Sequence, residues 1–195
     1  MTQRTKSRSG RGARQRILAA AAELFYREGI NATGVERLAT ESSVSKRTLY
    51  QHFPSKAAVV EAYLRDIEPR VANPLQLGSQ DADQTPRERL LALFQAPVGR
   101  GAPLRGCPFH NAAVEAAGSM PGVQEIVRAN KNKFIDAVTE LAEQAGAADP
   151  RLLANQLAVL YEGAASLATS LNDASAWDQA RTAAETLIDT GLAQR

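Results

Sequence analysis

The stretch from residue 33 to residue 56, TGVERLATESSVSKRTLYQHFPSK, constrains the fold of this chain more than any other part of it. It contains two short runs with helical spacing, and residues that can cap a helix stand before each run. Thr33 and Glu36 have the spacing of a capping box for the first run, and Ser45 can cap a second that reaches His52. We therefore expect two short helices joined by a tight turn, as in a helix-turn-helix.

Helical spacing recurs through the rest of the chain, whereas strand signals are weak. Val and Ile are sparse, Ala is abundant, and no two-residue hairpin turn separates alternating runs. The sequence predicts an all-α fold of about nine helices. The expected helices cover residues 17–28, 34–42, 46–52, 56–63, 86–96, 108–117, 123–145, 150–171 and 176–191. Ser55, Asp149 and Ser175 are expected to cap the helices that follow them, and Thr85 with Glu88 is expected to form a capping box. The polar stretch 75–84 is expected to be a linker, and 97–106 a loop.

The charge is divided unevenly along the chain. Residues 1–65 hold 12 Lys/Arg and 5 Asp/Glu, whereas residues 66–195 hold 11 and 16, so the net charges are +7 and −5. This division favours a polyanion-binding head on a different kind of body. Six of these 12 cations lie between Arg4 and Arg16, a basic stretch that could reach along the DNA backbone or into the minor groove. Without it, residues 17–65 are close to neutral, and charge alone therefore supports nucleic-acid binding weakly.

Several classes of protein and site are excluded at this stage. The single cysteine, Cys107, forms no internal disulfide and is too few for a multi-cysteine zinc site. The basic N-terminus has no apolar core behind it, and no run approaches the ~20 apolar residues of a membrane span. We expect a cytoplasmic protein with no membrane contact, no metal and no cofactor.

The start of the second short helix carries the side chains that a DNA-reading helix needs. Donors and cations at that end of a recognition helix meet base edges and phosphates. Arg47 can contact guanine with two hydrogen bonds, whereas Lys46 and Tyr50 suit phosphates. Ordinary solvated helices carry similar residues, so composition alone leaves both interpretations open. The candidate DNA contacts are Thr33, Ser45, Lys46, Arg47, Thr48, Tyr50, Gln51, His52 and Lys56.

The spacing of this segment resembles the TetR family of bacterial transcriptional regulators (TetR/AcrR type). That family is marked by a run like T-x-x-x-I-A-x-x-A-G-V-S-x-x-T-L-Y-x-H/Y-F-x-x-K. The residues in register here are Thr33, Leu38, Ala39, Val44, Ser45, Thr48, Leu49, Tyr50, Phe53, Pro54, Ser55 and Lys56. The run ILAAAAELFYREG at 17–29 resembles the family's first helix, and the resemblance covers about residues 11–65.

Two positions depart from the family pattern. The usual glycine before the Val-Ser pair is Ser43 here, which is mildly strained if the turn needs a positive φ. The frequent glycine before Thr48 is replaced by Arg47, which adds a side chain able to read a base. We therefore expect an operator preference particular to this chain.

The resemblance implies an architecture and a role for the remaining residues. Residues 1–12 are then a flexible basic tail, 13–60 the helix-turn-helix domain, and 61–195 a larger helical domain for ligand binding and dimerisation. It implies a regulator rather than an enzyme, most simply a repressor that binds a palindromic double-stranded DNA operator as a dimer. A small-molecule effector would release it. The Ala/Leu faces of the last two helices suit a homodimer interface, although they could also cover a monomer core.

The effector is expected among apolar and aromatic side chains of the middle helices, although most of these residues suit an ordinary core equally well. Asn130 lies on an apolar helix stripe, and a buried amide there needs a partner from the protein or a ligand. The candidates for the effector pocket are Leu93, Phe94, Cys107, Phe109, His110, Met120, Asn130, Phe134, Tyr161 and Trp177.

Cys107 supports an alternative function, thiol-based sensing of oxidants or electrophiles. It stands near the start of an expected helix with Arg105 two residues before it, a setting that lowers a thiol pKa. A free cysteine is more often a small buried hydrophobe. A thiol enzyme using Cys107 and His110 lacks an evident third group to orient the base, and a non-specific nucleoid-type binder would not need Arg47 on a rigid helix.

Overall fold

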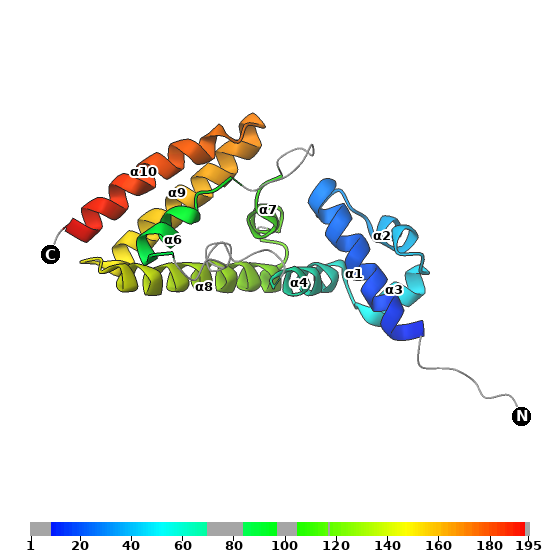
Figure 1. The fold of residues 1–195 in the computed structure, drawn as a ribbon. Coiled ribbons are helices and arrows are strands. Elements are labelled where there is room, and N and C mark those ends of the chain that lie inside the picture. The colour runs from blue at the N-terminus through cyan, green and yellow to red at the C-terminus, as the bar shows by residue number, and fades with distance from the viewer. Residues whose placement is uncertain (1–8, 70–83, 97–104, 117, 194–195) are drawn as a thin grey trace, which may run out of the picture. The chain divides into compact units, whose positions relative to one another are not determined.

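The computed structural model describes residues 9–69, 84–96, 105–116 and 118–193, in which all regular structure is α-helical (Figure 1). The helices are α1 (Ser9–Arg27), α2 (Val35–Glu41), α3 (Lys46–His52), α4 (Lys56–Ile67), α6 (Pro86–Ala92), α7 (Pro108–Glu115), α8 (Pro121–Ala145), α9 (Pro150–Leu171) and α10 (Ser175–Ala193). The expected all-α fold class is confirmed. None of the helices in these described residues is long and apolar enough to cross a membrane.

The chain divides into two compact units. The head unit consists of Met1–Pro69 together with Pro108–Val127, and the body unit of Arg70–Cys107 together with Arg128–Arg195. The sequence-based division at residue 60 follows chain order, whereas contacts group α7 and the first turns of α8 with α1–α4. Helix α8 therefore supplies residues to both units.

The head unit is built around a small apolar core. Ile17 from α1, Leu38 from α2 and Leu49 from α3 are all fully buried. The rings of Phe25 and Tyr63 meet edge to face, with centroids 5.5 Å apart. Of the apolar residues that match the family pattern, Leu38, Ala39, Leu49 and Phe53 are buried, whereas Val44 is half-buried. These contacts hold α2 and α3 at a defined angle on α1.

Two details at the start of the head unit differ from the sequence predictions. Helix α1 begins at Ser9, inside the stretch 1–12 that was expected to be a flexible tail. Gly34, not Thr33, caps α2, and it does so without a side-chain hydrogen bond. The predicted Thr33–Glu36 capping box is wrong because the Thr33 hydroxyl donates to the carbonyl oxygen of Gly29 at 2.7 Å.

Most of the other predicted helix starts are confirmed. The side chains of Ser45, Ser55 and Asp149 each accept the backbone N–H three residues ahead. Thr85 and Glu88 form the expected reciprocal capping box at α6. The cap predicted for the last helix is wrong: Ser175 is its first residue, and both its backbone N–H and its hydroxyl donate to the Asp173 carboxylate.

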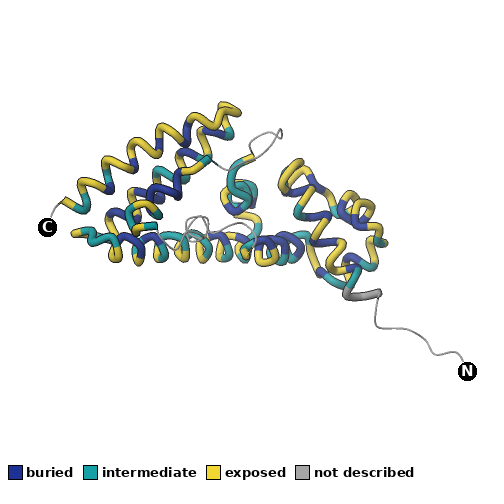
Figure 2. Tube along the Cα trace, in the orientation of Figure 1, coloured by how far each residue is buried: buried dark blue, intermediate teal, exposed yellow. Residues whose placement is uncertain are grey.

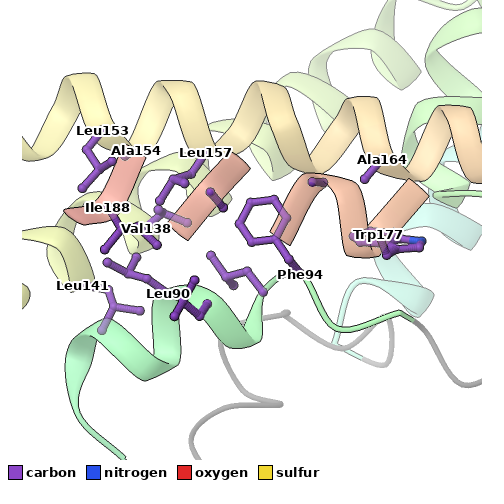
Figure 3. Close-up of a cluster of buried hydrophobic side chains, with 14 of the residues drawn as sticks. Leu90, Phe94, Val138, Leu141, Leu153, Ala154, Leu157, Ala164, Trp177 and Ile188 are labelled. Carbon is purple, nitrogen blue, oxygen red and sulfur yellow. The ribbon is translucent and has the colours of Figure 1, made fainter. Parts of the chain in front are cut away.

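The body unit packs α6, α9, α10 and the second part of α8 around one apolar core (Figure 3). Leu90, Phe94 and Ile188 are almost fully buried in it, and Leu157 joins them from α9. Helix α6 ends at Ala92, short of the expected 96, and α7 and α8 begin and end within a few residues of expectation. The tail at 1–8, the expected linker up to 83 and the expected loop at 97–104 lie outside the described residues.

One face of α9 remains outside this core. Leu153, Leu157 and Ala164 are buried, but Leu167 and Leu171, which continue the same apolar stripe in the sequence, are 50% and 62% exposed. Figure 2 shows the buried and exposed residues alternating along α9 and α10. The body unit thus leaves large apolar side chains of α9 in solvent.

Candidate nucleic-acid interface and effector region

The turn between α2 and α3 has the hydrogen bonds of a Schellman motif. The N–H of Ser43 donates to the carbonyl of Thr40, and the N–H of Val44 donates to that of Ala39, both at 3.0 Å. Ser43 has a φ of 51°, so the positive φ that the missing glycine raised as a possibility is present. Arg16 from α1 donates its Nε to the carbonyl of Ser42 at 3.0 Å. The turn is therefore fixed by its own backbone hydrogen bonds and by a side chain of α1.

Helix α3 presents one side to the core and the other to solvent. Leu49 is fully buried and anchors the helix, whereas Lys46, Arg47, Tyr50 and Gln51 are exposed. Thr48 and His52 are half-buried. The Thr48 hydroxyl lies 2.8 Å from that of the cap residue Ser45, and its backbone N–H donates to the same Ser45 oxygen. Four of the predicted interface residues on α3 are thus exposed, and two of them, Lys46 and Arg47, are cationic.

The two cations on this surface have different electrostatic settings. Lys46 forms an ion pair with Glu36 of α2, and this hydrogen bond, more than the charge attraction, raises the pKa of Lys46 and lowers that of Glu36. Arg47 has no hydrogen-bond or ion-pair partner among the described residues. Its guanidinium therefore keeps all its hydrogen-bond donors free of other described side chains, and a guanidinium can bind a guanine edge with two hydrogen bonds.

Two predicted contacts outside α3 are placed less favourably. Thr33 is fully buried with its hydroxyl on Gly29, so the structure offers no Thr33 side chain to a phosphate. Lys56, the first residue of α4, is half-buried, and its Nζ donates to the carbonyl of Asn31 at 3.4 Å. Burial lowers the pKa of Lys56, and the negative charge of Glu115 partly opposes this.

Two residues at the end of the basic stretch from Arg4 to Arg16 have structural contacts that the sequence did not predict. Arg14 lies over the ring of Phe53, with its guanidinium carbon 5.3 Å from the centroid, and Arg16 binds the turn carbonyl of Ser42. Both were assigned to a segment that could reach along DNA. Extending the helical spacing of the first helix from Ile17 toward the N-terminus is the sequence signal that could have placed both residues on α1.

Four of the candidate effector-pocket residues form an aromatic cluster in the body unit. Tyr161 stands at its centre, with ring centroids 6.4 Å from Phe94, 5.1 Å from Phe134 and 5.2 Å from Trp177. Burial raises the pKa of Tyr161 well above its ordinary value, and the neighbouring charges of Cys107 and Glu162 add to the shift.

The other candidates for the pocket do not all join this cluster. Leu93 is buried in the same body core, but Asn130 is half-buried rather than fully enclosed, which corrects the expectation of a buried amide. Phe109, His110 and Met120 belong to the head unit, where Phe109 is buried and His110 exposed. The predicted set is thus divided between two units.

Cys107 lies beside a partly buried ion pair that the sequence did not predict. Lys131 of α8 donates to the Cys107 sulfur at 3.6 Å and also pairs with Glu162 of α9. Side chains of both charged residues are about a quarter exposed, 26% and 28%. Polar residues interrupt the apolar stripe of α8 near Asn130, and among them Lys131 is the residue that contacts Cys107 and Glu162.

Comparison with known proteins decides the family. The family model described as "Bacterial regulatory proteins, tetR family" matches residues 17–63, which contain α2, the turn and α3. The description "Tetracyclin repressor-like, C-terminal domain" matches residues 86–184. This chain belongs to the TetR family. It is a transcriptional regulator with a helix-turn-helix DNA-binding region, and the family is one of regulators rather than enzymes.

Individual relatives agree with this assignment. The chain is 40% identical over 86 residues to the transcriptional activator FasR of Mycolicibacterium smegmatis, covering 43% of this chain and 37% of FasR. It is 35% identical over 83 residues to the repressor KstR2 of the same organism, covering 43% and 40%. The chain thus matches less than half the length of these curated relatives.

Solved structures extend the likeness over almost the whole chain. A TetR-family regulator from Streptomyces coelicolor superposes with a TM-score of 0.81 at 27% identity, covering 93% of this chain and 97% of that one. A regulator of the same kind from Streptomyces avermitilis gives a TM-score of 0.73 at 33% identity, covering 92% and 97%. The TetR-family protein described here therefore shares both the head and the helical body with its relatives.

Proposed function

We propose that this TetR-family protein is a repressor that binds a palindromic operator as a homodimer and is released by a small-molecule effector. The observation that carries the proposal is the exposed surface of α3. There Arg47, which has no partner in the described part of the chain, stands beside Lys46, Tyr50 and Gln51 on a helix that follows a Schellman turn. Related proteins include both an activator and a repressor, so the sign of regulation belongs to the proposal.

The exposed apolar face of α9 supports the dimer. Leu152, Val159, Leu167 and Leu171 lie along one side of this helix, and Val159 is 73% exposed. Gly163 stands within the same face, and a Cβ there would meet nothing within 4 Å. Four large apolar side chains on one helix face are unfavourable in water, and a second copy would cover them. The two head units of such a dimer could then read half-sites ~34–36 Å apart.

The DNA-binding proposal is tested by selecting genomic DNA fragments with the purified protein at moderate salt. Wild type should recover one palindromic motif, and Tyr50→Ala should lose it. Tyr26→Ala is the matched control, because Tyr26 is another exposed tyrosine but lies on α1, away from α3. Arg47→Ala should relax the preference at one base position in each half-site, at a cost of about 1–3 kcal/mol per contact. Equal recovery by wild type and Tyr50→Ala would refute the interface.

The dimer is tested by sedimentation of Val159→Arg. Two buried guanidinium groups at the interface should convert the dimer to monomer while the helical content stays unchanged. Val114→Arg is the control, since Val114 is 65% exposed on α7 and lies outside the α9 face. If Val159→Arg remains dimeric, the interface lies elsewhere.

The aromatic cluster supports an apolar effector, and the chain offers a natural probe of it. Trp177 is the single tryptophan, and it packs against Tyr161 in the cluster. An apolar compound that enters this region should change the tryptophan emission and weaken operator binding over the same concentration range. Phe134→Ala should shift both responses together, whereas a compound that changes only one of them is not the effector.

Thiol-based sensing is the second candidate, favoured by the Lys131 ammonium beside Cys107. In an electrophile response, the thiolate would form an S–C bond at the β-carbon of an activated alkene, and the α-carbon would take up a proton. The test is the rate of N-ethylmaleimide addition followed by mass spectrometry. Addition should be several-fold slower in Lys131→Met, and modification should weaken operator binding. An unchanged rate or unchanged binding would remove this candidate.

A further inference from the structure

Helix α7 is joined to the turn after α1 by two hydrogen bonds from one residue. The backbone N–H of Asn31 donates to Oε2 of Glu115 at 2.8 Å, and the Asn31 side-chain amide donates to the Glu115 carbonyl at 3.1 Å. The two residues are 84 positions apart in the sequence, yet both belong to the head unit. Glu115 is the last residue of α7, so the carboxylate fixes the end of that helix to the turn.

The backbone at Gly29 is shaped to receive this carboxylate. Gly29 has a φ of +97°, and a Cβ built there would lie 3.1 Å from Oε2 of Glu115. A side chain at this position would therefore be strained and would press on the carboxylate. The turn thus accommodates Glu115 at close range, in addition to the hydrogen bonds from Asn31.

The third member of this group is Lys56 of α4, one of the DNA contacts predicted from the sequence. Its Nζ donates to the carbonyl of Asn31, the residue whose N–H and amide bind Glu115. The negative charge of Glu115 also acts on the ammonium, and the Lys56 side chain is half-buried. In this arrangement the amine donates a hydrogen bond to the Asn31 carbonyl and is attracted by the Glu115 carboxylate, and both groups compete with a phosphate for the same cation.

We propose that Glu115 is a positioning residue for operator binding: together with Asn31 it holds Lys56 back from the operator phosphate, so that α7 sets how much of this cation the DNA can use. The proposal rests on the proposed function, because it presumes that Lys56 contacts an operator. Helix α7, which lies within the sequence of the predicted effector domain, would thus control a cation that contacts DNA. Displacement of α7 would free Lys56 for one phosphate contact in each half-site.

The charge of Glu115 can be removed while its geometry is kept. Gln at position 115 can still accept the Asn31 N–H, but it no longer attracts the Lys56 ammonium. Glu115→Gln should therefore tighten operator binding by about three- to tenfold at moderate salt, the scale of one partly screened charge pair. Glu125→Gln is the matched control, since Glu125 is an exposed carboxylate of the head unit on α8 and should leave affinity unchanged.

A double-mutant cycle with Lys56→Met separates the proposed route from a general charge effect. If Glu115 acts through Lys56, Glu115→Gln should change affinity less than twofold when Lys56 is already Met. Equal tightening in both backgrounds, or no tightening in wild type, would overturn the proposal. If wild type itself selects no operator, the proposed function fails instead, and that result is recognised before any variant is compared.

Hydrogen exchange tests the contact without DNA. The Asn31 amide should exchange at least tenfold faster in Glu115→Ala, which removes the carboxylate acceptor, and should remain protected in Glu115→Gln. Glu125→Ala should leave the Asn31 amide unaffected. An Asn31 amide that exchanges at the same rate in wild type and Glu115→Ala would show that the connection does not exist in solution, which would overturn the proposal whatever the DNA affinities.

Discussion

Ser43 holds a backbone conformation that suits glycine better, so Ser43→Gly should stabilise this protein. Its φ of 51° lies in the left-handed region, at the C′ position of the Schellman turn after α2. A non-glycine residue there costs about 1–2 kcal/mol. Glycine adds freedom to the unfolded chain, which costs about 0.5–1 kcal/mol. The expected net gain in the free energy of unfolding is therefore about 0.5–1 kcal/mol.

The measurement is urea unfolding followed by circular dichroism, with thermal unfolding as a second readout. Ser43→Ala is the control, because alanine also lacks the hydroxyl but keeps the unfavourable positive φ. Glycine should raise the unfolding midpoint, whereas alanine should not. Because the turn keeps its hydrogen bonds, operator affinity should stay within about twofold of wild type, under a few tenths of a kcal/mol.

A second left-handed residue provides a further comparison. Asn172 has a φ of 50° at the end of α9, and asparagine tolerates this region better than serine. Asn172→Gly should therefore stabilise less than Ser43→Gly. The strain argument is refuted if Ser43→Ala stabilises as much as Ser43→Gly, or if Ser43→Gly lowers the unfolding midpoint.

The remaining predictions concern the body unit. Gly106→Ala should lower the free energy of unfolding by about 1–2 kcal/mol in urea titrations, because its φ is +68° and the new Cβ would lie 2.9 Å from the Thr169 hydroxyl; a neutral result would contradict that crowding. Thr85→Ala should cost about 1 kcal/mol by removing the α6 cap. Hydrogen bonds from the Thr85 backbone and side chain lower the pKa of Glu88 from 4.5, so its stabilising contribution is complete above that value and is lost as pH falls through the folded pKa. The loss of stability between neutral pH and pH ~3 should be smaller in Thr85→Ala than in wild type.

The helix starts show what local chemistry can predict. Ser45, Ser55 and Asp149 were identified as caps from their positions before apolar runs, and each caps its helix in the structure. A cap is a contact over three residues, so the sequence alone contains all its partners. The same rule gave a wrong prediction at Thr33, because its hydroxyl donates a hydrogen bond to the carbonyl of Gly29, four residues earlier.

The effector region shows where local reasoning ends. The aromatic candidates Phe94, Phe134, Tyr161 and Trp177 were recognised by residue type, but only the packing of their helices brings their rings within 5.1 to 6.4 Å of Tyr161. The same pattern of apolar residues also included Phe109, which lies in the other unit. Residue type indicates that a side chain is buried, but it does not indicate against what.

The sequence by itself determined the helical class, the helix-turn-helix with its strained Ser43, and the family, because these depend on spacings within a few turns of chain. Tertiary structure decided which cations are available. Lys46 pairs with Glu36, Lys56 binds the Asn31 turn near Glu115, and Arg47 has no partner among the described residues. These partners lie between 10 and 84 residues apart. The charge available to DNA depends on such distant neighbours because electrostatic attraction falls with distance in space, not with separation along the chain.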